Sequence, residues 1–170
     1  MDDMVVKPVG IVKSGTEAPS LVADGGDLQW RGDLAHARSA AGAVSELVIN
    51  PEYEGILDGI EDFSHALVLY WAHSVPPEGR NLTKVHPMGR QDLPLVGLFA
   101  TCSPARPNPI CVSAVRIIER RGLTLRVEGI DAVDGSPVVD VKPYLPHYYA
   151  VEDAEVSDWM ARIMRELDGE

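Results

Sequence analysis

The sequence is poor in cysteine and in aromatic residues, and it contains no long apolar run. Its 170 residues include two cysteines, Cys102 and Cys111, which form neither a CxxC pair nor a disulfide framework. This excludes a small disulfide-stabilised secreted domain. No apolar stretch is long enough to cross a bilayer, so no membrane partner is expected. The first residues carry no basic region followed by an apolar one, so no secretory signal is expected; with free thiols, this favours the cytoplasm.

Two further patterns are missing. No G-x-G-x-x-G follows the first apolar segment and no alternating strand–helix rhythm is present, which argues against a doubly wound dinucleotide-binding fold. The two cysteines and the histidines His65 and His73 do not have the spacing of a zinc site, so no metal is expected.

The charge is unevenly distributed along the chain. The net charge of −11 argues against a protein built mainly to bind nucleic acid. Residues 80–126, however, contain eight basic and two acidic residues, a net charge of +6 that leaves −17 for the remainder. Two interpretations stay open: a local basic face on an acidic body, or scattered surface charges.

The remaining residues are those of an ordinary soluble protein, with 45% hydrophobic and 24% charged residues and one domain expected from the length. Apolar and alternating patterns predict strands over 5–12, 43–49, 65–72, 93–101, 110–118, 123–130 and 138–141. The strand over 65–72 is expected to be buried on both faces. Residues 14–33 and 74–92 are expected to be loops. One or two helical turns are predicted over 51–60, with Asn50 as N-cap.

A C-terminal helix is predicted over 154–167, because six apolar residues there share one helical face. The fold class expected is mainly β: a small single-domain β-barrel with a C-terminal helix. The barrel is expected to span residues 1–150. The helix, within 151–170, is expected to pack on the barrel or to lie at a dimer interface.

Residues 97–113 read GLFATCSPARPNPICVS. Three prolines, Pro104, Pro107 and Pro109, fix φ and remove backbone donors, so the loop that contains them cannot join a sheet ladder. It presents Ser103, Arg106 and Asn108 between two apolar segments. It is interpreted either as a wall of a ligand site or as a stiff surface crossover.

Four other clusters carry reactive side chains: Asp62 to His65, His73, Asp131 to Gly135, and Asp140 to Tyr144. Each has a structural alternative. The two histidines are compatible with structural roles at strand ends, and Asp134-Gly135 is a common turn signal. Asp140 and Lys142 lie on one face of a strand, where they could pair on the surface at little energetic gain.

Three segments together resemble the TrmO (TsaA, YaeB-like) family: GLFATCSPARPNPICVS, DFSHALVLYWAH and DAVDGSPVVDVKPYLP, in the same order and within residues 5–148. The resemblance implies a small β-barrel that binds S-adenosylmethionine and works as a dimer. Its characterised members methylate N6 of the threonylcarbamoyl-adenosine beside the anticodon of certain tRNAs.

The resemblance also implies cofactor contacts. By motif position they fall on Ala18, Pro19, Ser20, His73, Ser74, Cys102, Val112, Asp131, Ala132, Val133 and Asp134. The chain departs from the family pattern in three places: no Arg or Gln follows Pro19, Cys102 replaces an arginine, and Cys111 replaces a glycine. The sulfonium charge of the cofactor is expected to be met by Asp131 or Asp134 and by nearby aromatic faces, with Phe63, Tyr70 and Trp71 in the neighbourhood.

On the acceptor side, a nitrogen nucleophile must lose a proton, so a carboxylate or a histidine within hydrogen-bond reach would help. We expect His65, Asp140 or Tyr144 to serve there, with Lys142 orienting. Arg106 and Asn108 are expected to bind substrate. Three functions are compatible: tRNA methylation with Arg106, Arg116 and Arg120 on phosphates, methylation of a small molecule, and cofactor binding without catalysis.

Overall fold

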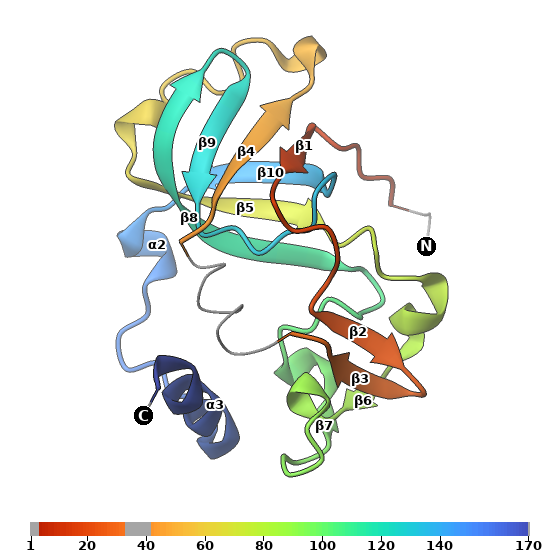
Figure 1. Cartoon of the computed structure of the whole chain (residues 1–170). Helices are drawn as coiled ribbons and strands as arrows, with labels where there is room; N and C mark the ends of the chain where they lie inside the picture. The colour runs from red at the N-terminus through yellow and green to blue at the C-terminus, as the bar shows by residue number, and fades with distance from the viewer. Residues whose placement is uncertain (1–3, 33–41, 170) are drawn as a thin grey trace. The chain divides into compact units, whose positions relative to one another are not determined.

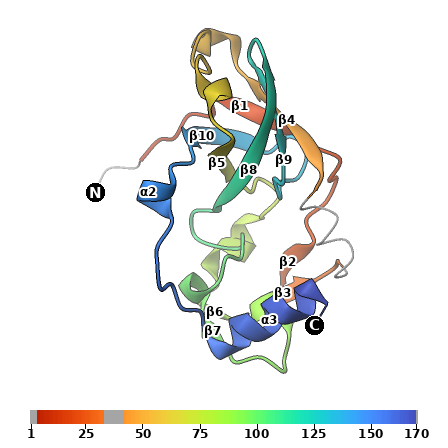
Figure 2. The ribbon, with the colours of Figure 1, turned by 90° about the vertical axis from the view of Figure 1, so that its left-hand side faces the viewer.

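The computed structural model describes residues 4–32 and 42–169, which fall into two compact units. The barrel unit contains residues 1–19, 40–74 and 109–144, and the second unit contains residues 20–39, 75–108 and 145–170. Both are drawn in Figure 1 and, turned by 90°, in Figure 2. Each unit is built from segments that are distant in the sequence.

The barrel unit is a closed six-stranded barrel with the strand order β1-β10-β5-β8-β9-β4 (Figure 1). All pairs are antiparallel. Its strands are β1 (Gly10–Lys13), β4 (Val44–Ile49), β5 (His65–Trp71), β8 (Ile110–Arg121), β9 (Thr124–Glu128) and β10 (Pro137–Pro143). The mainly β barrel expected from the sequence is confirmed, and closure removes the unpaired edges that an open sheet would expose.

Alternation along the strands builds the core of the barrel. Leu47, Val68, Val115, Leu125 and Val127 are fully buried, each with polar or partly exposed neighbours on its own strand. The expected half-buried strand over 123–130 and the turn at Gly122, which has φ +59°, are therefore confirmed. The expectation for 65–72 was wrong: β5 alternates between buried and partly exposed residues, as in a strand with one face in the barrel core and the other turned outward.

Two other expectations in the barrel unit are confirmed in part. The helical turns predicted over 51–60 are present as 3-10 turns, η1 (Pro51–Tyr53) and η2 (Ile60–Asp62), with Asn50 at the N-cap position of η1. Asn50 makes no side-chain cap; its Nδ2 instead donates to the carbonyl of Pro8 at 3.2 Å. The first strand is also shorter than expected and begins at Gly10, after Pro8.

The second unit consists of short elements. Its strands are β2 (Leu21–Asp24), β3 (Asp27–Trp30), β6 (Lys84–Val85) and β7 (Val96–Gly97), paired as two small ladders; its helical segments are η3 (Pro77–Asn81), η4 (Pro87–Gly89), η5 (Leu98–Ala100), α2 (Pro146–Tyr149) and α3 (Asp158–Asp168).

Two sequence-based expectations fail here. The loop expected over 14–33 contains the β2–β3 hairpin, with Gly25 and Gly26 at positive φ in its turn; Asp33 lies outside the described residues. The long strand expected over 93–101 is reduced to β7, because the chain turns into η5 directly after Gly97.

The C-terminal helix is confirmed as α3, with Ser157 as N-cap and Gly169 at φ +88° as C-cap (Figure 2). Ile163 is buried. Arg90 forms ion pairs with Glu166 and, at 2.8 Å, with Asp92, and Arg162 pairs with the same two carboxylates. The helix is thus held to the 87–92 segment by four charged groups. Among the described residues, no helix has the length and apolar character needed to span a membrane.

Candidate functional site

The C-terminal end of β5 meets the loop that follows β9. The hydroxyl of Tyr70 donates a hydrogen bond to the carbonyl of Asp131, and Nδ1 of His73 lies 3.2 Å from Oγ of the buried Ser136. Burial raises the pKa of Tyr70, so its phenol stays protonated and serves as a donor. Two predicted cofactor segments, His73 and the 131–134 loop, are therefore adjacent in the barrel unit.

The segment after β1 is joined to the same loop. The amide of Asp134 donates to the carbonyl of Thr16 at 2.8 Å, two residues before Ala18. Ser14 donates its amide to Oδ1 of Asp134 at 3.0 Å and its hydroxyl to the carbonyl of Ala132 at 2.8 Å. The structure thus brings the stretch that leads to Ala18 and Pro19 to the 131–134 loop. Sequence reasoning missed Ser14, which no motif singled out.

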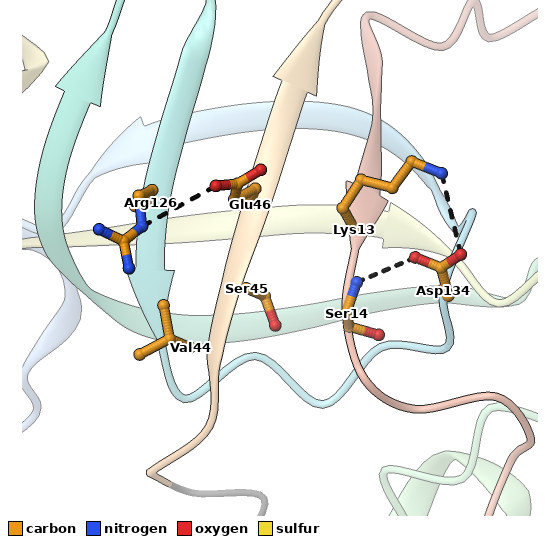
Figure 3. Close-up of a pocket in the computed structure, with 7 residues that line it drawn as sticks. All are labelled: Lys13, Ser14, Val44, Ser45, Glu46, Arg126 and Asp134. Carbon is orange, nitrogen blue, oxygen red and sulfur yellow. Dashed lines mark hydrogen bonds and ion pairs between the residues drawn. The ribbon is translucent and has the colours of Figure 1, made fainter.

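The two carboxylates of this loop differ in their surroundings. Asp134 accepts the Ser14 amide and lies 3.8 Å from Nζ of Lys13 (Figure 3). Asp131 is exposed, and its backbone carbonyl accepts the hydroxyl of Tyr70. Asp134 therefore anchors β1 to the loop, whereas the Asp131 carboxylate can face a ligand.

An open depression of about 480 Å³ lies on the outside of the barrel beside this loop (Figure 3). Charges of both signs surround it; its lining residues are Lys13, Ser14, Val44, Ser45, Glu46, Arg126 and Asp134. Asp134 is the predicted cofactor residue that it includes. His73 and Val112 are not part of its lining, so the depression does not coincide with the predicted cofactor site.

Val112 lies on β8 opposite Leu69 of β5. Its side chain points away from the buried core and is 62% exposed. Ser74 follows His73 directly and is exposed as well.

The four predicted acceptor-side residues lie along β5 and β10. The amide of Tyr144 donates to the carbonyl of His65 at 2.9 Å, and Nδ1 of His65 lies 2.9 Å from Oγ of Ser64. Asp140 and Lys142 form an ion pair of 2.6 Å on the outer face of β10. The surface pairing considered from the sequence is therefore present.

The structure separates this group from His73. β5 has seven residues, so His65 at its start and Trp71 at its end are about 20 Å apart. Asp140, opposite Leu69, is closer to the His73 end. His65 and Tyr144 thus lie at the end of β5 that is away from His73, whereas Asp140 lies toward the His73 end.

The remaining predicted residues, Ser20, Cys102, Arg106 and Asn108, belong to the second unit. Arg106 donates from Nε to the carbonyl of Ser103 at 2.8 Å and from Nη2 to that of Thr101 at 2.6 Å. Two of its donors thus shape the Pro-rich loop itself. Cys102 is exposed, as is Asn108.

Most arginines of the basic stretch are paired with carboxylates. Arg116 pairs with Glu128, Arg121 with Glu119, Arg126 with Glu46 and Glu119, Arg120 with Asp58 and Glu61, and Arg90 with Asp92 and Glu166. Within the described residues, Lys84 and Arg106 have no such partner. Two of the three arginines expected on phosphates, Arg116 and Arg120, are therefore paired with carboxylates of the same chain.

The second unit also holds an Asp–His pair that sequence reasoning missed. Oδ2 of Asp27 lies 2.6 Å from Nδ1 of His86, and the amides of His86 and Leu28 both donate to Oδ1 at 2.8 Å. Partial burial alone would raise the pKa of Asp27, but these hydrogen bonds hold it below its ordinary value. Asp27 ties the β2–β3 hairpin to η4. No group of three or more His, Cys, Asp or Glu that could hold a metal is present in the part of the chain that the structure describes.

Comparisons with known proteins agree with this architecture. The family model of the tRNA-methyltransferase O N-terminal domain matches residues 35–150. A probable S-adenosyl-L-methionine-binding protein of Methanothermobacter thermautotrophicus is 40% identical over 146 residues, which cover 85% of this chain and 93% of that protein. The S-adenosyl-L-methionine-binding protein of Archaeoglobus fulgidus is 36% identical over 152 residues, covering 89% and 97%.

Two further similarities cover only part of the other protein. The tRNA (adenine(37)-N6)-methyltransferase of Escherichia coli is 40% identical over 103 residues, 58% of this chain and 43% of that enzyme. The crystal structure of TrmO from Pseudomonas aeruginosa matches with a TM-score of 0.66 and 27% identity, over 92% of this chain and 63% of that one. This chain thus spans about two fifths of the enzyme and less than two thirds of the solved structure. Because the family model covers more than half of its length and agrees with its fold, the chain belongs to the TrmO family.

Proposed function

We propose that the protein is an S-adenosylmethionine-dependent N-methyltransferase whose acceptor is N6 of an adenosine beside the anticodon of a tRNA. The observation that carries the proposal is the family match over residues 35–150, which include β5 and the 131–136 loop. Relatives named as S-adenosyl-L-methionine-binding proteins and as a tRNA N6-methyltransferase support both halves of it. The finer proposal, a threonylcarbamoyl-adenosine acceptor, rests on the three motifs alone.

The residues in the barrel unit fit a sulfonium ligand. The exposed Asp131 carboxylate supplies a negative charge, and the neighbouring Tyr70 and the buried Ser136 hold its loop in place. We propose that Asp131 meets the positive charge and that Ala18, Pro19, His73, Ser74, Val112 and the 132–134 backbone surround the ligand. Ser20 and Cys102 belong to the proposed site by motif position.

When bound, S-adenosylmethionine supplies an electrophilic methyl group and leaves as a neutral thioether. The protein must hold the acceptor nitrogen in line with that methyl group, and it must accept the proton that the nitrogen loses. Asp140 is the member of the predicted acceptor group nearest to the His73 end of β5, and Lys142 at 2.6 Å orients its carboxylate. We assign this proton-accepting role to Asp140 in preference to His65 and Tyr144.

A small-molecule acceptor is the second candidate. Ion pairing of Arg116 and Arg120 lowers the charge available for phosphates, and Cys102 stands where the family motif has an arginine. Methyl transfer without RNA would support this alternative. Cofactor binding with no methyl transfer to either acceptor class would support a non-catalytic binding protein.

The first experiment is a calorimetric titration with S-adenosylmethionine and with S-adenosylhomocysteine, followed by transfer of labelled methyl groups to tRNA. We expect micromolar binding with one ligand per chain, and label on N6 of the adenosine beside the anticodon. Absence of binding, with and without tRNA, would contradict the proposal. Replacing Cys102 by Arg tests the family's arginine: unchanged activity would show that this position does not decide acceptor use.

We also propose a homodimer in the cytoplasm, as the resemblance implies. The outer face of β8 carries two exposed apolar side chains, Val112, which is 62% exposed, and Ile118. Sedimentation velocity would show a dimer that Ile118→Asp dissociates. The cytoplasmic location is likewise a proposal.

A further inference from the structure

Phe99 is an aromatic side chain that the core does not use. It lies in η5 and is 81% exposed, whereas its neighbour Leu98 is buried. Leu95, four residues earlier, is 55% exposed. An exposed apolar residue is ordinary when it stands alone, and a partner would have reason to cover a ring as exposed as that of Phe99.

The loop around Phe99 is rigid. The hydroxyl of Thr101 donates to the carbonyl of Leu98 at 2.8 Å and accepts the amide of Ser103 at 3.2 Å. Ser103 is buried, and its own hydroxyl accepts the amide of Ala105 at 3.2 Å. The loop therefore loses little conformational entropy when a ligand binds, and this favours high affinity.

The guanidinium of Arg106 lies over the Phe99 ring. Its Cζ lies 5.9 Å from the ring centroid, and its Nε and Nη2 are anchored on the carbonyls of Ser103 and Thr101. Arg106 thus fixes a cation on one face of the ring and leaves the other face to solvent. A planar, electron-rich group is the partner that such a face selects.

The charge near the ring points to a polyanion. Lys84 pairs with Gly97 in the β6–β7 ladder, and the amide of Leu98 donates to the carbonyl of Thr83 at 3.0 Å, so Lys84 lies close to η5. Lys84 and Arg106 are the two residues of the basic stretch identified above as having no carboxylate partner in the described part of the chain. An aromatic platform beside two cations matches single-stranded RNA, whose bases stack while its phosphates are neutralised.

We propose that Phe99, backed by Arg106, is a stacking platform for an unpaired nucleobase of the RNA substrate, and that Lys84 contacts a neighbouring phosphate. The inference rests on the proposed function, since it names the part of the second unit that holds the acceptor strand. It assigns Arg106 a role behind an aromatic ring rather than a direct phosphate contact.

The test compares Phe99→Ala, Phe99→Trp and the wild type in binding an anticodon stem-loop RNA and a fully paired duplex of equal length. We expect Phe99→Ala to bind the stem-loop about ten- to a hundredfold more weakly, Phe99→Trp to bind as the wild type does, and duplex binding to be unaffected. The salt dependence should be unchanged in Phe99→Ala and should lose about one unit of slope in Lys84→Gln.

Tyr148→Ala is the matched control, because Tyr148 is an aromatic residue of the same unit that is 73% exposed. Equal stem-loop affinity in wild type and Phe99→Ala, or equal losses in Phe99→Ala and Tyr148→Ala, would overturn the inference. So would conversion of a dimer to a monomer by Phe99→Ala, which would assign the ring to a second copy of the chain. If the wild type methylates no RNA while binding the cofactor, the proposed function fails instead.

Discussion

At the scale of single residues, two carboxylates three positions apart have different tasks. Asp134 is engaged by Ser14 and Lys13 and fixes the loop, whereas the Asp131 side chain is exposed at its beginning. The sequence DAVDG marks both as candidates, and a turn signal alone explains Asp134. Only the contacts distinguish a structural carboxylate from one that can meet a ligand.

Asp131→Asn is therefore expected to weaken binding of S-adenosylmethionine about tenfold and to leave binding of S-adenosylhomocysteine nearly unchanged. The carboxylate acts on the sulfonium charge, which the thioether product lacks. Calorimetry with both ligands checks this. In the matched variant, Asp134→Asn, we expect lower thermal stability with no preference between the two ligands. Equal losses for both ligands in Asp131→Asn would contradict the assignment.

At the scale of elements, closure of the barrel depends on a close approach at Gly10. A Cβ at this position would lie 2.4 Å from the carbonyl oxygen of Val48 and 2.9 Å from Cα of Ile49, both backbone atoms. β1 pairs with β4 and β10 and so joins the two ends of the sheet. A side chain at Gly10 would push β1 from β4.

Gly10→Ala is expected to destabilise the protein by about 1–3 kcal/mol. For a chain of this size that corresponds to a melting temperature lower by roughly 3–10 °C, measured by calorimetry or circular dichroism. Gly15→Ala, just beyond the other end of β1, is the control, because nothing lies within 4 Å of its added Cβ. A similar melting temperature for both variants would show that the strand adjusts without cost.

The attachment of α3 is expected to be sensitive to pH. Hydrogen bonds from Arg90 hold the pKa of Asp92 and that of Glu166 below their ordinary values. Groups of this kind stabilise the folded state fully above their unfolded pKa values, and the contribution is lost as the pH falls through the folded ones. The helix should therefore stay docked at neutral pH and detach progressively below about pH 4.

Fluorescence of Trp159 in a chain with Trp30 and Trp71 replaced by Phe would follow this transition. Arg162→Gln should move it to higher pH, because Asp92 and Glu166 each lose a partner. Arg165→Gln, on the same helix and without a carboxylate partner in the described residues, should leave it in place. Identical curves for the two variants would mean that apolar packing around Ile163 holds the helix.

At the scale of the whole molecule, the distribution of charge bears on the proposed RNA substrate. The net charge is −11, and the arginines that make residues 80–126 basic are largely paired with acidic side chains from other parts of the chain. Long-range attraction to a polyanion should be weak, and recognition should depend on few contacts.

The logarithm of the RNA association constant is accordingly expected to fall with the logarithm of salt concentration with a slope of about one, corresponding to the phosphate contact of Lys84. Binding titrations between 50 and 200 mM salt would measure it. A slope of six or more would show that paired arginines, among them Arg116 and Arg120, exchange their carboxylates for phosphates when RNA binds.

The sequence alone determined the barrel class, the alternating strand that became β9, the C-terminal helix and the family, because periodicity and contiguous motifs are local properties of a chain. It did not determine the β2–β3 hairpin, the half-burial of β5 or the shortness of β7. These features depend on which face of a strand is covered by the rest of the fold. They also depend on groups distant in the sequence that stabilise a tight turn, as Asp27 stabilises the turn at His86.

Only the tertiary structure decided which site residues lie near one another. Tyr70 and Asp131 are 61 residues apart and share a hydrogen bond, whereas His65 and His73, eight residues apart, are held at opposite ends of one extended strand. It likewise decided that the basic stretch is largely neutralised, since the acids that pair with Arg120 come from residues 58 and 61. Coulombic interactions and hydrogen bonds depend on the distance between two groups in space. In a closed sheet that distance is not determined by how far apart the residues are in the sequence.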